Sequence, residues 1–232
     1  MIELDLIEFG VKNPIKHWYY QHKFWFISQS NLWNNRGKKS LVDIGAGSAL
    51  FSKELLRQEL VTDIVAIDTG YKVESELKDG IYYRRSSSYS GFTHFLLTDV
   101  LEHIDNDEKF LTEVVSGADN NSAFIITVPA LMSLWSGHDV HLKHFRRYTK
   151  LELRNLVEQS GLSISSIRYT YSTVFPMAYL QRKLSGNHSQ DSHVRENGWV
   201  VGLILRIMLL PDRWISFLPF GISLYLEATK NE

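Results

Sequence analysis

The fold of this chain is decided by the stretch Ser40-Leu-Val-Asp-Ile-Gly-Ala-Gly-Ser-Ala-Leu50. Its first five residues form a short apolar run, which two glycines then interrupt, and leucines at helical spacing follow over 50–60. This pattern predicts a strand, a tight turn and a helix. A second β-like run, 63–68, comes directly after, so we expect one βαβ unit with parallel strands.

Strand-like and helix-like segments keep alternating along the rest of the chain. Strands are expected at 93–98, 122–128, 163–171 and 223–229, and helices at 110–115 and from Thr149, which forms a capping box with Glu152. The alternation predicts an α/β fold with a doubly wound, mostly parallel sheet and helices on both faces. A long connection separates the last two expected strands, so we also expect a helical insertion before the final strand.

Composition narrows the class of protein. The chain has 232 residues, of which 44% are hydrophobic, and this length and apolar content suit a single domain with a full core. The formal net charge is −1 and the basic residues form no long block, so nucleic acid is not expected as a partner. No cysteine is present, which excludes disulfides and thiolate chemistry.

Localisation can be predicted from two segments. The amino terminus, 1–8, carries acidic residues where a secretory signal would carry lysine or arginine, so a cytoplasmic protein is expected. The most apolar segment, 199–210, contains Arg206 and stops at Pro211, well short of the roughly 20 residues needed to span a bilayer. We therefore expect no transmembrane helix.

The glycine turn is the first candidate binding site. Gly45 and Gly47 allow the backbone to bend sharply off a strand and to approach a ligand beneath a helix N-terminus. Asp68, at the end of the next strand, can accept hydrogen bonds from both hydroxyls of a ribose. Leu50 stands where a dinucleotide fingerprint has its third glycine, which disfavours NAD or FAD. Asp43, just before the glycines, suits the ammonium group of an amino acid better than a pyrophosphate.

Together with the run Thr98-Asp-Val-Leu-Glu-His103, these residues resemble class I S-adenosylmethionine (SAM)-dependent methyltransferases, over about 41–149. The resemblance implies a Rossmann-like, seven-stranded sheet with an antiparallel last strand and implies SAM as cofactor. It assigns cofactor binding to Asp43, Gly45, Ala46, Gly47, Asp68, Asp99, Val100 and Leu101. Ala49 stands where the family frequently has a third glycine. The segment 85–89 shows no acidic residue for the adenine, which stays unassigned.

Two further stretches, 17–26 and 135–148, are similar to a bacterial methyltransferase subgroup of largely unknown substrate. The aromatic stretch 17–26 precedes the first strand in that subgroup and can cover the cofactor, for which we name Trp18. The candidate residues for binding the acceptor are Trp135, Asp139, Arg146 and Tyr148, and those for catalysis are His138, His103 and His141. Of the adjacent Arg146 and Arg147, at most one is expected to reach the pocket.

A metal site is not expected. Histidines at 138, 141 and 144 would not converge on one ion, because steps of three residues drift around a helix. No carboxylate pattern of a known zinc site accompanies them.

The single domain divides into four segments. These are an N-terminal helical cap (1–39), a SAM-binding core (40–171), an insertion or lid (172–222) and the last strand (223–232). Within the insertion, 199–220 combines aromatic and basic side chains. A lid or a dimer face is expected there, with a peripheral membrane contact as the alternative. The chain is expected to be a monomer or a homodimer.

The function predicted from these residues is SAM-dependent methyl transfer to an oxygen or nitrogen of a small-molecule or glycan-type acceptor, by in-line displacement. If the acceptor is a hydroxyl, a histidine would take its proton. One alternative is a catalytically silent protein of this fold that binds SAM or a nucleoside and serves as a partner or regulatory subunit. An NAD-dependent oxidoreductase is the other, which Leu50 and Asp43 oppose.

Overall fold

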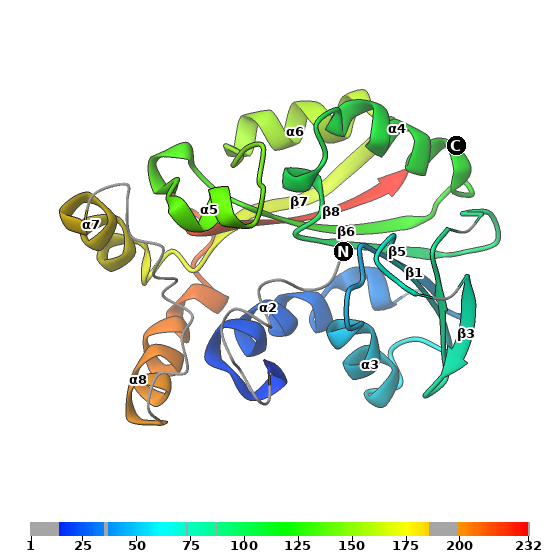
Figure 1. Cartoon of the computed structure of the whole chain (residues 1–232), viewed down its shortest axis with the longest axis horizontal. Coiled ribbons are helices and arrows are strands. Elements are labelled where there is room, and N and C mark those ends of the chain that lie inside the picture. Colours follow the sequence, from blue (N-terminus) through cyan, green and yellow to red (C-terminus); the bar gives the residue numbers. More distant parts are fainter. Residues whose placement is uncertain (1–13, 35–36, 73, 87, 186–198, 232) are drawn as a thin grey trace.

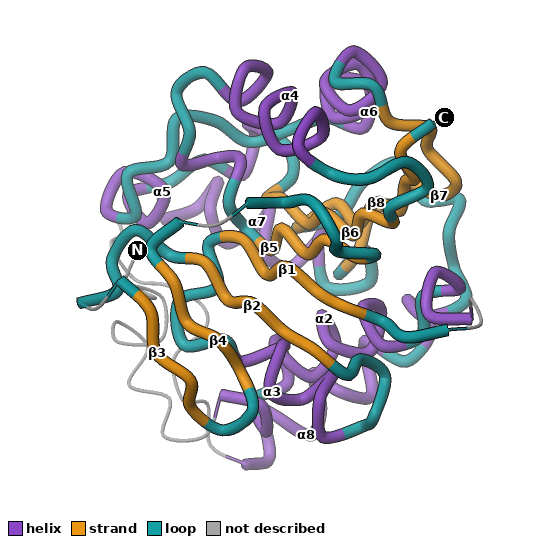
Figure 2. The backbone as a smooth tube through the Cα atoms, turned by 90° about the vertical axis from the view of Figure 1, so that its right-hand side faces the viewer, coloured by secondary structure: helices purple, strands orange, loops and turns teal. Residues whose placement is uncertain are grey.

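A mixed sheet of eight strands forms the centre of the computed structural model, which describes residues 14–34, 37–72, 74–86, 88–185 and 199–231 (Figure 1). In chain order the strands are β1 (Ser40–Ile44), β2 (Asp63–Ile67), β3 (Ser75–Lys78), β4 (Ile81–Arg84), β5 (His94–Thr98), β6 (Ala123–Pro129), β7 (Leu162–Thr170) and β8 (Ser223–Lys230). Their order in the sheet is β3-β4-β2-β1-β5-β6-β8-β7 (Figure 2).

The directions of the strands confirm the predicted doubly wound sheet. Strands β4, β2, β1, β5 and β6 are parallel to one another. The last strand, β8, is antiparallel to both β6 and β7, as expected. The eighth strand is an addition to the expected seven: β3 forms an antiparallel hairpin with β4, through Asp79 and Gly80 at positive φ.

Helices cover both faces of the sheet (Figure 1). The α-helices are α2 (Trp18–Ser28), α3 (Leu50–Arg57), α4 (Asp107–Gly117), α5 (Gly137–His141), α6 (Lys150–Gln159), α7 (Phe175–Ser185) and α8 (Trp199–Leu209). Short 3-10 helices are η1 (Pro14–Lys16), η2 (Asn31–Asn34), η3 (Leu101–His103), η4 (Met132–Leu134) and η5 (Pro211–Arg213). Helices α4 and α6 lie on one face, and α2 and α3 lie on the other.

Alternation along each central strand produces this two-sided core. In β1, Val42 and Ile44 pack in the cluster that includes α4 and α6, whereas Leu41 packs in the cluster of α2 and α3. A strand that is buried on both faces reads as a continuous apolar run, which is why the pattern predicted β1 with its observed bounds. The predicted capping box of α6 is also present, with a Glu152 N–H to Thr149 Oγ1 distance of 3.2 Å.

The connection between β7 and β8 contains α7, α8 and η5, which confirms the helical insertion. Asp212 of η5 ties it to the rest of the domain, because its buried carboxylate accepts hydrogen bonds from His22 Nε2 at 2.8 Å and from the Tyr171 N–H at 2.7 Å. Helix α8 buries Leu205 and Leu209 against α2, and the exposed apolar side chains of this helix are Val200, Val201, Leu203, Ile204, Ile207 and Met208. The exposed apolar surface of α8 fits a lid, a dimer face and a membrane contact equally. These three roles therefore stay predictions.

Two segments used in the sequence-based interpretation fall outside the described residues: the acidic amino terminus, 1–8, and 186–198 of the expected insertion. Of the helices in the described part of the chain, none has the length and apolar character needed to cross a bilayer.

We predict that the glycine turn tolerates no side chain at Gly45. The φ of Gly45 is 68°, and a Cβ there would lie 2.7 Å from Val100 Cγ2. Gly45→Ala should therefore lower the free energy of unfolding by about 2–4 kcal/mol, through left-handed strain and overpacking. Chemical denaturation measures this loss.

Gly91→Ala is the matched control, because Gly91 has a φ of 85° and nothing within 4 Å of its Cβ position. That change should cost about 1–2 kcal/mol, through backbone strain alone. In a Val100→Ala background, Gly45→Ala should cost no more than the control. Equal losses at Gly45 and Gly91 in the wild-type background would contradict the packing argument.

Candidate functional site

The glycine turn is fixed to the neighbouring strand by backbone hydrogen bonds. The N–H groups of Gly45 and Ala46 donate to the Ile67 carbonyl at 2.8 Å and 3.0 Å. Gly45 and Gly47 both have positive φ, which explains why glycine stands at these positions. The turn after β1 therefore lies directly beside the end of β2.

Asp68 closes this turn from the end of β2. Its buried carboxylate accepts hydrogen bonds from the N–H of Gly47 at 3.1 Å and from the N–H of Gly70 at 2.7 Å. The Tyr71 hydroxyl donates to the Gly47 carbonyl at 2.8 Å. The carboxylate expected to hold a ribose is thus fixed against the backbone of the turn.

The opposite side of the turn is the start of α3. Ala49 adopts the left-handed conformation, with a φ of 55°, and makes no side-chain cap. A residue with a Cβ adopts this conformation less readily than glycine does. Asp43 is buried at the end of β1 and accepts a hydrogen bond from Ser52 Oγ at 2.6 Å, which joins the strand to α3.

Asp99 lies beside the glycine turn, because the next residue, Val100, packs against Gly45. Its carboxylate accepts a hydrogen bond from Thr127 Oγ1 at 3.1 Å and forms an ion pair with Lys23 of α2. Burial alone would lower the pKa of Lys23, but the attraction of Asp99 outweighs burial and the pKa is raised. Helix α2 thus contributes a buried positive charge to the end of β5.

A cavity of about 90 Å³ opens next to Asp99. It is lined by Tyr19, Asp99, Glu102, Pro129, His138, Leu142, His144, Arg147, Arg182, Ile222 and Ser223. The lining residues come from α2, the ends of β5 and β6, the segment around α5, helix α7 and the start of β8. Doubly wound sheets bind their ligands at this edge, outside the carboxyl ends of the parallel strands.

Asp139 organises the far wall of the cavity. Its fully buried carboxylate accepts hydrogen bonds from Arg147 Nε at 2.7 Å and from His144 Nδ1 at 3.0 Å, and it lies 3.7 Å from Arg182 Nη1. Burial alone would raise the pKa of Asp139, but the bond from His144 and the charge of Arg147 outweigh it and hold the pKa well below its usual range. Asp139 therefore positions three side chains that line the cavity.

Two histidines are held neutral at pH 7: His138, which lines the cavity, and His103, which follows the lining residue Glu102 in the sequence. Burial, opposed by the charge of Asp139, lowers the pKa of His138 to about 4. Burial and the neighbouring His144 lower the pKa of His103 to about 4. A neutral imidazole keeps a lone pair on one ring nitrogen, so each can accept a proton or bind a metal ion.

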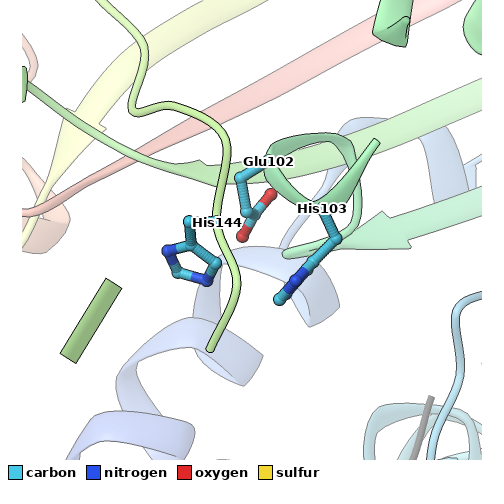
Figure 3. Close-up of side chains that lie close together, drawn as sticks. All are labelled: Glu102, His103 and His144. Atoms are coloured by element: carbon cyan, nitrogen blue, oxygen red, sulfur yellow. The ribbon is translucent and has the colours of Figure 1, made fainter. Parts of the chain in front are cut away.

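Glu102, His103 and His144 point toward one another (Figure 3). One ligand atom from each of the three side chains lies within 4.8 Å of the others. The two imidazole rings have centroids 4.6 Å apart at an interplanar angle of 77°, and Glu102 is fully buried. Two imidazoles and a carboxylate are a ligand set for a divalent metal ion.

The other residues proposed from the sequence lie elsewhere. His141 is exposed, and Trp135, beyond η4, does not line the cavity. Val100 and Leu101 are buried in the core cluster of α4 and α6. The ring of Trp18 packs among the apolar residues of the insertion.

The two arginines take different places, as expected of adjacent residues. Arg147 lines the cavity, whereas Arg146 forms an ion pair with Asp107 at 2.6 Å on the surface. The Tyr148 hydroxyl also donates to Asp107, at 2.7 Å, and burial together with this bond raises the pKa of Tyr148. Of the residues named from the sequence in the stretch 135–148, His138 lines the cavity, and Leu142, His144 and Arg147 line it in addition.

Sequence reasoning assigned no role at the site to Tyr19, Lys23, Glu102, His144 or Arg182. Glu102 stands within the run 98–103. The Glu-His pair that follows a central strand there could have indicated Glu102 as a residue of the site. Lys23 is the only lysine or arginine in the aromatic stretch 17–26, which marks it as a side chain that needs a buried partner. No local pattern indicates Arg182, because α7 reaches the cavity only through tertiary packing.

We predict that Asp139→Asn lowers the free energy of unfolding by about 3–5 kcal/mol, because the change leaves Arg147 buried without a counter-charge. The control is Glu54→Gln, which removes a surface ion pair with Arg57, a residue that is 70% exposed. The control should cost less than about 1 kcal/mol. Urea denaturation of both variants measures the two losses in the free energy of unfolding. Similar losses would show that Asp139 contributes no more to stability than a carboxylate on the surface does.

Comparison with known proteins rests on structure. No protein-family model matches the sequence, and no curated protein does. A SAM-dependent methyltransferase from Archaeoglobus fulgidus superposes with a TM-score of 0.58, at 13% identity, over 98% of this chain and 98% of that one. The plantazolicin methyltransferase BamL, in complex with a triazolic desmethylPZN analogue and SAH, gives 0.53, at 15% identity, over 96% and 87%.

A third similar structure carries a different description. The [4+2]-cyclase SpnF superposes with a TM-score of 0.58, at 11% identity, over 91% of this chain and 81% of that one. At identities of 11–15%, these superpositions concern the fold alone. The chain has the Rossmann-like fold of class I SAM-dependent methyltransferases.

Proposed function

We propose that this protein binds SAM beside the glycine turn and transfers its methyl group to an acceptor in the neighbouring cavity. The acceptor class is a small molecule or a glycan-type compound. One observation carries the proposal: the turn at Gly45, the carboxylate of Asp68 and the segment that begins at Asp99 are in contact, and the cavity lies next to them.

The residues present suit the parts of SAM. Gly45 carries no side chain, and its positive φ and the close Val100 side chain leave no room for one, so the turn itself presents main chain where the methionine moiety would lie. The start of α3 has no side-chain cap, which leaves its N–H groups for a carboxylate. Asp68 is a buried carboxylate at the end of the second parallel strand, where a ribose would be held. Leu50 packs in the core, at the place of the third glycine of a dinucleotide site.

Methyl transfer requires that the acceptor atom be aligned with the methyl group, more than it requires a strong acid or base. When bound, SAM supplies a methyl group on a sulfonium that leaves as a neutral thioether. His138, neutral at pH 7, takes the proton of an acceptor hydroxyl on a ring nitrogen. Arg147 holds the acceptor side of the cavity, and Tyr19 of α2 closes it and excludes water.

A second candidate function is a catalytically silent protein of this fold, which binds SAM or a nucleoside and acts as a partner or regulatory subunit. SpnF is described as a cyclase, and proteins of one fold need not share a reaction, so the fold alone does not establish methyl transfer. Calorimetry with S-adenosylhomocysteine, followed by methyl-transfer assays with a panel of sugars and small metabolites, separates the two. Binding without turnover on any acceptor supports the silent protein.

Asp68→Ala should weaken the binding of S-adenosylhomocysteine by about 1–3 kcal/mol, because the ribose and the turn lose a charged acceptor. The matched control is Asp63→Ala at the other end of β2, where the carboxylate pairs with Lys38 and accepts a hydrogen bond from Thr62 on the surface. The control should leave the affinity unchanged. Titration calorimetry measures both, and unchanged affinity in Asp68→Ala would refute the ribose assignment.

His138→Ala should reduce turnover by about 10²-fold or more and leave the affinity for S-adenosylhomocysteine unaltered, because the imidazole acts on the acceptor. His141→Ala, an exposed position on the same short helix, is the control. Steady-state kinetics with the best acceptor of the panel gives the first quantity and calorimetry the second. A parallel loss of affinity and turnover in His138→Ala would remove its role at the acceptor.

A further inference from the structure

We propose that Glu102, His103 and His144 bind a divalent first-row transition-metal ion, and that this ion holds and activates a hydroxyl oxygen of the methyl acceptor. The ion site is inferred from the geometry of the three side chains alone and does not depend on the proposed function. Its role toward the acceptor rests on the proposed function, which it narrows to O-methylation. The sequence alone led us to expect no metal site.

The geometry of the three side chains supports one ion. Their ligand atoms lie within 4.8 Å of one another, and all three point inward (Figure 3). Two ligands on one ion at bonds of about 2.1 Å lie roughly 3.4 Å apart, so closing the site needs shifts of about 1 Å. A glutamate can supply such a shift by rotating its terminal bonds. Neighbours in the sequence provide two of the ligands, and the third comes from the segment after α5.

Hydrogen bonds around the cluster orient both imidazoles. Asp139 Oδ1 accepts from His144 Nδ1 at 3.0 Å, which leaves Nε2 of His144 as the ligand atom. His103 is bonded to the backbone of Leu142, so its other ring nitrogen is available. A metal-binding histidine typically donates its second ring N–H to a carboxylate or a backbone carbonyl in this way. The cluster thus has the surroundings of a metal site as well as its ligands.

The ligand set indicates the class of ion. Imidazole suits zinc, copper, iron and nickel, whereas magnesium, calcium and manganese favour oxygen ligands. Catalytic zinc sites use three protein ligands, including the set of two histidines and one glutamate, and keep a position open for water or substrate. Because Glu102 and His144 both line the cavity, the open position would face the acceptor.

The step that follows is balanced with the sulfonium methyl donor as the co-reactant. A hydroxyl that coordinates a divalent cation loses its proton more readily. The proton goes to His138, an oxygen lone pair forms the new bond to the methyl carbon, and the carbon–sulfur bond breaks with its electron pair left on sulfur. Acceptors without a hydroxyl, such as simple amines, gain nothing from this arrangement.

The test uses the full-length protein, treated with a chelator and then titrated with Co²⁺ in the visible range and with Zn²⁺ in the calorimeter. We expect one ion per chain, with intense Co²⁺ bands of a low-coordinate site. His144→Ala and Glu102→Gln should each weaken binding at least tenfold, and the exposed His141→Ala should not. Circular dichroism checks that each variant folds.

X-ray absorption of the Co²⁺-loaded wild type keeps the test independent of the variants, because it should show two imidazole ligands. No stoichiometric binding, binding that is equal in all variants, or a spectrum without imidazole would overturn the ion site. The calorimetric heat of S-adenosylhomocysteine is measured alongside. Heat without metal binding defeats this inference alone, whereas metal binding without heat defeats the proposed function and with it the role of the ion toward the acceptor, but leaves the ion site.

Discussion

The contact between the glycine turn and the ends of two neighbouring strands is the constraint on which the site depends. Gly45 packs against Val100 so closely that no Cβ fits between them, and Asp68 holds the N–H of Gly47 from the other side. The backbone after β1 is therefore fixed between β2 and β5. The main chain of the glycine turn, the start of α3 and the buried carboxylate of Asp68 therefore lie next to one another.

A buried carboxylate organises the acceptor half of the site in a similar way. Asp139 holds Arg147 and His144 through charged hydrogen bonds, and both side chains then line the cavity. The cost of burying Asp139 is offset only because its partners are positioned around it. Helix α2 closes the arrangement with the ion pair of Lys23 and Asp99, which joins an early segment to the cofactor side.

Much of the fold could be predicted because the central strands are buried on both faces and read as continuous apolar runs. Strand β3 was missed because all four of its residues are exposed, and only Asp79-Gly80 signalled its hairpin. The glycine turn could be predicted from the sequence because its positive φ angles favour glycine, at Gly45 and Gly47. The acceptor cavity was predictable only in part, since Arg182 and His144 reach it through the packing of separate helices and loops, which no local spacing records.

The most direct test of the central claim is a crystal structure of the wild-type protein soaked with S-adenosylhomocysteine. We expect density for the ribose within hydrogen-bond distance of Asp68 and for the amino-acid end between the glycine turn and α3. Density for the ligand at any other place, or a vacant turn at saturating ligand, would contradict the account.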